Sequence, residues 1–244
     1  MRPAAIAHLL AFDAAGGGCA AAVWSRGRVV ARRSEAMRRG QAEKLVPMIE
    51  AVMAEAGLRY GDLDAVAVTV GPGGFTGVRL GLATARGLAL ARELPLIGVT
   101  SFEALAAAVP EEEREEAKRA GATLAVLIDA KRRDIYAQAF DSTAAPVGDP
   151  VALPPEDLDA YFPPGPLLLI GDASEQARPE LERAGRRCIL SRAPALVDAG
   201  VVAGLAAAAG IPRPDAPPPR PLYLRAPDVT LPARAKPVEG ETSS

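Results

Sequence analysis

The sequence of 244 residues offers few side chains for catalysis. Its single histidine is His8, and its two cysteines are Cys19 and Cys188. A histidine metal site or a serine-histidine-aspartate triad would have to use His8, which lies inside an apolar run that predicts a strand. Two cysteines are too few for a disulfide scaffold or a paired zinc motif. We therefore expect no bound metal, no cofactor, and a reducing, cytoplasmic environment.

A glycine-rich loop (GPGGFTG, 71–77) follows a predicted strand and opens a predicted helix. Backbone N–H groups at such a helix start could hold a phosphate. The loop lacks the lysine of a Walker motif, and Thr76 stands where the dinucleotide pattern has its last glycine. Two interpretations stay open: a phosphate-binding turn that uses Gly71 and Gly73, and a sharp strand-to-helix turn, which we favour.

Two aspartates end predicted strands, Asp13 in the first half of the chain and Asp129 in the second. Such a pair could hold Mg²⁺ and a nucleotide phosphate across a cleft. However, Asp13 is followed by two alanines and Asp129 by the run 130–132 (AKR), so neither turn supplies hydroxyl groups or glycine. We interpret both as polar strand caps, and a vestigial nucleotide site formed with Gly71 and Gly73 is the alternative.

Glycines recur within the helix predicted over 75–92. Gly77, Gly81 and Gly87 each weaken a helix by about 1 kcal/mol relative to alanine. Gly77, Gly81 and Ala85 follow one another at intervals of four, which places them on one small-residue seam. Another helix could approach this seam closely, either from the same chain or from a partner protein.

Hydrophobic periodicity places these residues on an α/β framework. In the first half it predicts strands at 7–13, 19–24, 28–35, 66–70 and 96–99, and helices at 42–56 and 75–92. The first helix has the amphipathic spacing of Leu45, Met48, Ile49 and Val52. In the second half it predicts strands at 124–129, 135–140 and 167–170, and helices at 174–184 and 195–209. The charged stretch 111–119 (EEEREEAKR) is interpreted as a solvated face.

Composition and charge limit the classes of function. The net charge of −2 argues against a protein that wraps nucleic acid. After the first apolar run, no stretch approaches about 18 uninterrupted apolar residues, so we expect no membrane span. One local exception is the segment 26–44, with seven basic and two acidic residues. We interpret it as a solvated hairpin face, and contact with RNA phosphate is the alternative.

Several segments resemble, in chain order, the bacterial TsaB proteins: 10–13 (LAFD) with Cys19, 41–50 (QAEKLVPMIE), 71–79 (GPGGFTGVR), 87–89, 95–99 (PLIGV), 128–130 and 223–225. The resemblance implies an actin-like ATPase (ASKHA) fold of two α/β domains with mixed sheets flanked by helices, the second degenerate. We expect an N-terminal domain over 1–108, completed by 212–231, a smaller domain over 109–211 and a disordered tail over 232–244. Residues 212–221 are interpreted as an extended linker and 221–225 as a short strand or docking segment.

The resemblance also implies a function. TsaB proteins are non-catalytic partners of TsaD in forming N6-threonylcarbamoyladenosine at position 37 of ANN-decoding tRNAs, with TsaE as a further partner. We therefore expect a scaffold or activator that meets tRNA only through the complex and could form a homodimer when alone. The positions of TsaD's metal-binding histidines are Ser101 and Leu105 here. The alternative is an actin-fold ATPase or phosphotransferase that uses Asp13 and Asp129.

The family pairs its first two helices with those of TsaD as a four-helix bundle, and which face of each helix points outward is left open by the sequence. The partner interface is expected to use residues of these helices: Leu45, Met48, Ile49, Val52, Phe75, Gly77, Gly81 and Ala85.

Overall fold

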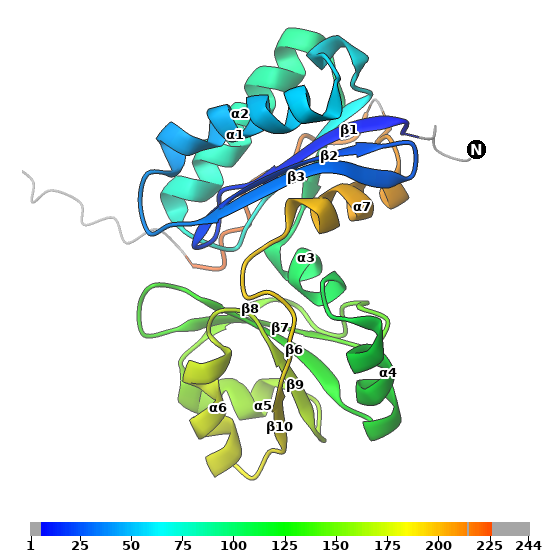
Figure 1. Ribbon diagram of the computed structural model, residues 1–244. Helices are drawn as coiled ribbons and strands as arrows, with labels where there is room; N and C mark the ends of the chain where they lie inside the picture. Colours follow the sequence, from blue (N-terminus) through cyan, green and yellow to red (C-terminus); the bar gives the residue numbers. More distant parts are fainter. Residues whose placement is uncertain (1–5, 214, 226–244) are drawn as a thin grey trace, which may run out of the picture.

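The computed structural model describes residues 6–213 and 215–225, which form two α/β units, one above the other in Figure 1. Each unit contains a five-stranded mixed sheet, with the strand orders β3-β2-β1-β4-β5 and β10-β9-β6-β7-β8. Read from the other edge, the second order repeats the first, because each sheet joins an antiparallel meander to two parallel strands. The predicted architecture of two related α/β units is confirmed.

The first sheet contains five strands: β1 (His8–Asp13), β2 (Gly18–Ser25), β3 (Arg28–Ala36), β4 (Ala65–Thr69) and β5 (Leu96–Val99). Two helices, α1 (Gln41–Ala56) and α2 (Phe75–Arg92), lie side by side on one face of it. Alternation along β1 divides the core, because Leu10 and Phe12 pack towards these helices while Leu9 and Ala11 face the opposite layer.

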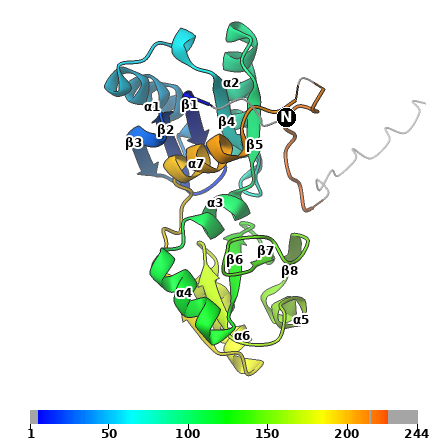
Figure 2. The ribbon, with the colours of Figure 1, turned by 90° about the vertical axis from the view of Figure 1, so that its right-hand side faces the viewer.

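The opposite face of the first sheet is covered by α7 (Ala199–Ala209), with α3 (Ser101–Ala107) between the two units (Figure 2). Alanines of β2 and the sequence AGVVAGLAAAA of α7 let helix and sheet approach closely. The predicted boundary at residue 211 is therefore wrong, because α7 returns from the second half of the chain to complete the first unit. Asp198 accepts a hydrogen bond from the Gly200 N–H and caps α7, which begins at 199 and not at 195.

The second sheet is built from β6 (Thr123–Asp129), β7 (Ile135–Phe140), β8 (Val151–Leu153), β9 (Leu167–Ile170) and β10 (Cys188–Leu190). Around it lie α4 (Glu111–Ala120), α5 (Leu158–Tyr161) and α6 (Ser174–Arg183). Two 3₁₀ turns, Tyr60–Asp62 and Pro155–Asp157, complete the described elements. No helix in the described part of the chain is long and apolar enough to span a bilayer.

The C-terminal segment docks on the first unit without forming a strand. The Leu222 N–H donates to the Val70 carbonyl at 2.8 Å, and Arg86 donates to the Pro219 carbonyl at 2.9 Å. Of the two predicted alternatives for 221–225, the docking segment is confirmed. The predicted tail over 232–244 lies outside the described residues.

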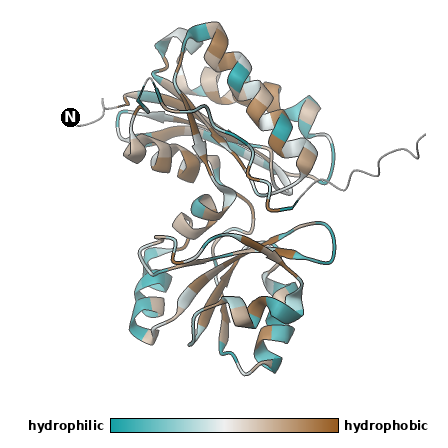
Figure 3. Ribbon diagram, turned by 180° about the vertical axis from the view of Figure 1, so that it is seen from behind, coloured by the Kyte–Doolittle hydropathy of each residue, from teal (hydrophilic) through white to brown (hydrophobic). Residues whose placement is uncertain are grey.

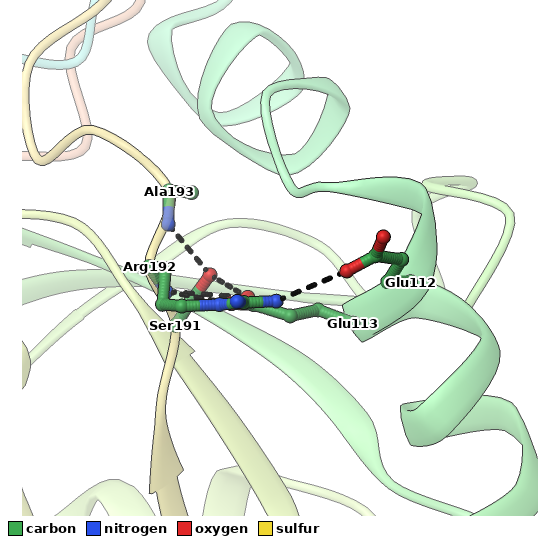
Figure 4. Close-up of polar contacts among 5 residues, drawn as sticks. All are labelled: Glu112, Glu113, Ser191, Arg192 and Ala193. Carbon is green, nitrogen blue, oxygen red and sulfur yellow. Dashed lines mark hydrogen bonds and ion pairs between the residues drawn. The ribbon is translucent and has the colours of Figure 1, made fainter.

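The charged stretch 111–119 forms α4, and one of its acids is buried, which corrects the prediction of a wholly solvated face. Glu113 is only 7% exposed and joins α4 to the segment that follows β10 (Figure 4). Its carboxylate accepts from Ser191 Oγ at 2.5 Å, from Arg192 Nε at 2.6 Å and from the Arg192 N–H at 3.0 Å. Burial alone would raise the pKa of Glu113, but these hydrogen bonds outweigh it, so its pKa is lowered.

We predict that Glu113→Gln lowers the free energy of unfolding at neutral pH by about 1–3 kcal/mol, because Ser191 and Arg192 lose a buried, charged hydrogen-bond acceptor. Since the folded pKa lies below the ordinary value of 4.5, this stabilisation is complete above pH 4.5 and disappears as the pH falls through the folded pKa. Urea unfolding between pH 3 and 7 measures the effect. Glu112→Gln, at a side chain 85% exposed, is the matched control and should change little. A loss independent of pH would contradict the assignment.

Candidate functional site

Asp13 is a buried carboxylate at the end of β1, 3% exposed. It accepts hydrogen bonds from the Thr69 hydroxyl and from the Ala15 N–H. Desolvation raises its pKa, and the hydrogen bonds offset only part of that effect. Asp13 therefore fixes the end of β1 to β4 and to the turn that follows β1.

That turn, residues 14–17, packs directly against the glycine-rich loop and the start of α2. The Ala15 carbonyl accepts from the Gly74 N–H at 2.7 Å, and a Cβ added to Gly73 would lie 2.2 Å from the same oxygen. A Cβ on Gly77 would lie 2.0 Å from the Ala14 carbonyl oxygen. Both glycines are thus required by backbone contact within the chain.

This contact changes the electrostatics of the predicted phosphate loop. An anion at a helix N-terminus needs free N–H groups and the positive end of the helix dipole. Here carbonyl oxygens, which carry partial negative charge, lie against the first turn of α2. Gly71 is buried, and a Cβ added to it would lie 3.3 Å from the Leu222 carbonyl oxygen, so the C-terminal segment also packs close to the start of the loop. The favoured sequence interpretation, a tight strand-to-helix turn, describes this geometry.

Asp129 has its own cationic partner. Lys131 Nζ lies 2.9 Å from its carboxylate and 3.6 Å from that of Asp172, and the Asp172 carboxylate accepts the Asp129 N–H. The hydrogen bond to Asp129 is the main cause of a raised pKa of Lys131. Asp172 follows β9, so its proximity could not be predicted from the sequence around Asp129.

A cavity of about 450 Å³ lies between the two units. It is bounded by residues 72–75, the turn 130–132 and the docked segment 222–225. The guanidinium of Arg79 lies 3.5 Å from the Phe75 ring centroid, and its Nε donates to the Tyr223 hydroxyl at 2.9 Å. Neither Asp13 nor Asp129 lines this cavity, so the structure does not bring the two predicted acids together there.

The two residues expected at the positions of TsaD's metal-binding histidines lie in the core of this chain. Ser101 and Leu105 are 3% and 2% exposed on α3. Among the described residues no group of three histidine, cysteine or acidic side chains could hold a metal ion. His8 instead forms a hydrogen bond with Ser25 Oγ at 3.0 Å.

The predicted interface residues mostly face inward. On the sheet-facing side of α1, four residues are at most 8% exposed: Leu45, Met48, Ile49 and Val52. Gly81 and Ala85 are buried on α2, where a Cβ on Gly81 would meet the Val68 side chain at 3.4 Å. These positions pack on the first sheet, so the prediction that they form an open partner surface is wrong in this chain. Phe75, in contrast, is 50% exposed.

A different stripe of α2 points to solvent, offset by two residues from the predicted seam. Its members recur at helical spacing and are all exposed: Phe75, Arg79, Ala83, Gly87 and Leu90. Leu90 is 83% exposed, and a Cβ on Gly87 would meet nothing within 4 Å. Figure 3 shows apolar residues along α2, whereas α4 and α6 of the second unit are largely hydrophilic. Periodicity predicts the pattern of small residues on α2, but it does not predict which stripe of the helix packs on the sheet.

Comparisons with known proteins agree on one family. The TsaD family, described as tRNA N6-adenosine threonylcarbamoyltransferase, matches residues 33–168. The TsaB protein of Escherichia coli is 36% identical over 130 residues, 53% of each chain. An uncharacterised protein of Mycobacterium tuberculosis is 35% identical over 201 residues, 82% of each chain. The chain thus spans about half the length of its E. coli relative and most of the mycobacterial one.

A solved structure shares the fold of this chain. YeaZ from Pseudomonas aeruginosa superposes with a TM-score of 0.70 at 27% identity, over 89% of this chain and 100% of that chain. The arrangement of the two α/β units is therefore shared with YeaZ.

Two of the glycines of α2 give a direct test of this site. We predict that Gly77→Ala lowers the free energy of unfolding by about 1–3 kcal/mol, because its Cβ cannot fit against the Ala14 carbonyl. Gly87→Ala, the matched control in open space, should instead stabilise the isolated chain by up to about 1 kcal/mol through helix propensity. Urea unfolding compares the two. Equal effects would show that the turn 14–17 does not pack on α2 as described.

Proposed function

Since this chain belongs to the TsaB family, we propose that it is a non-catalytic subunit in the formation of N6-threonylcarbamoyladenosine in tRNA, and that it binds a TsaD-type catalytic subunit. The observation that carries the proposal is the solvent-facing stripe of α2, which is apolar or small at four of its five positions. A TsaE-type ATPase is proposed as a further partner, and tRNA is reached through the complex.

A non-catalytic role is supported by the groups that occupy the two candidate nucleotide sites, the glycine-rich loop and Asp129. The carbonyls of Ala14 and Ala15 lie against the start of α2, and Lys131 neutralises Asp129. A phosphate would have to displace backbone contacts, and Mg²⁺ would have to displace an ammonium group. These costs disfavour the alternative ATPase or phosphotransferase.

The partner surface is supported by the outer faces of α1 and α2. Val46 of α1 is 46% exposed, and on α2 the exposed residues include Leu90 and Gly87. Gly87 weakens the helix by about 1 kcal/mol without any contact inside the chain that requires it. A partner helix that approaches closely at Gly87 would explain the glycine. The same face would serve a homodimer when the catalytic subunit is missing.

We predict that Leu90→Glu weakens binding to a TsaD-type subunit of the same organism at least tenfold, because it places a charge in an apolar contact. The melting temperature of the chain alone should not change, since Leu90 is exposed. The dissociation constant is measured by calorimetry or biolayer interferometry with purified proteins.

Val147→Glu is the matched control, because Val147 is 52% exposed in the second unit and far from α2 in sequence. It should bind as the unaltered chain does. If Leu90→Glu binds with unchanged affinity, the interface does not include the exposed stripe of α2. If the unaltered chain binds no TsaD-type subunit, the proposed function itself is overturned.

A further inference from the structure

β3, the turns at its two ends and the first four residues of α1 form a basic stripe, residues 26–44, which contains none of the residues named for the proposed partner surface. The stripe has a charge of +5, from seven basic and two acidic residues, while the whole chain has −2. The remainder of the chain therefore carries −7. Such a separation of charge creates a local positive field on a protein whose total charge is negative.

Only part of this positive charge is neutralised. Arg32 pairs with Asp198 at 3.1 Å, Arg33 with Glu55 at 3.3 Å and Lys44 with Glu35 at 3.4 Å. Among the described residues, four exposed arginines of the stripe form no ion pair: Arg26, Arg28, Arg38 and Arg39. Arginine is charged at all physiological pH values and binds phosphate in a bidentate manner.

The four arginines lie at opposite ends of an open sheet edge. β3 is the outermost strand of the first sheet and forms its front edge in Figure 1. Its nine residues span about 30 Å at about 3.3 Å per residue, with Arg26 and Arg28 at one end and Arg38 and Arg39 beyond the other. This geometry suits an extended, regularly charged ligand better than a compact anion.

We propose that this basic stripe binds the phosphate backbone of tRNA within the complex, an inference that rests on the proposed function. The contacts are to phosphate and carry no sequence information, so they position the RNA without selecting it. Charge at a sheet edge also prevents edge-to-edge aggregation, but either sign of charge would do this. Among the described residues, the stripe has four unpaired arginines against one unpaired acid, Glu43, and this excess of positive charge favours an anionic polymer.

The test compares two pairs of neighbouring basic residues. Arg38→Gln/Arg39→Gln removes two charges from the stripe, and Lys118→Gln/Arg119→Gln removes two exposed charges from α4 of the second unit. A fourfold variant adds Arg26→Gln and Arg28→Gln. Binding of unmodified tRNA is measured over a range of salt concentrations, both with the reconstituted complex and with the chain alone.

We expect the fourfold variant to bind tRNA about tenfold more weakly or worse near 0.1 M salt, with the slope of log K against log salt reduced by about 3. The α4 pair should change neither quantity. If the fourfold variant assembles into a complex that modifies tRNA with unchanged affinity and slope, the proposal that the stripe binds tRNA is overturned. The proposed function would then remain intact. If no complex forms, the proposed function fails, and the measurement on the chain alone still decides whether the stripe binds RNA.

Discussion

The contact between the turn 14–17 and the start of α2 determines the arrangement of the first unit. Ala15 accepts the Gly74 N–H, and Gly73 and Gly77 leave the space that the turn needs. Buried Asp13 fixes the same turn to Thr69 on β4. Because this contact sets how α2 lies on the sheet, it decides which stripe of the helix is covered and which is exposed. It also places carbonyl oxygens where an anion would otherwise meet the helix.

In our proposal, one structural feature thus has two effects. Closing the glycine-rich loop disfavours nucleotide chemistry in this chain, and the same packing orients Gly87 and Leu90 towards a partner. The second unit contributes stability through the Glu113 network, and α7 returns across the molecule to cover the first sheet. β3 is the edge of the first sheet opposite β5, whereas α2 packs on β4 and β5. The basic edge is therefore accessible in a complex formed through α2.

The long helices and the buried strands could be predicted from the sequence, and the predicted bounds of α2 and β5 match the structure at both ends. Burial of one face gives a long helix a regular apolar repeat, and a buried strand is a compact apolar run. α3 was missed although Thr100 and Glu103 form a capping box, since seven residues give little periodicity. The seam of Gly77 and Gly81 was recognised, but spacing cannot say whether a sheet or a partner covers it. The pairing of Asp129 with Lys131 and Asp172, and the return of α7, depend on contacts between distant parts of the chain.

The most direct measurement is calorimetric titration of ATP with Mg²⁺ into the purified chain alone. If the chain's own carbonyls and Lys131 fill the sites that a nucleotide would need, no saturable binding should appear at millimolar nucleotide. Saturable binding at one equivalent per chain, reduced by Asp13→Asn or Asp129→Asn without loss of folding, would contradict the account and support a nucleotide-dependent enzyme.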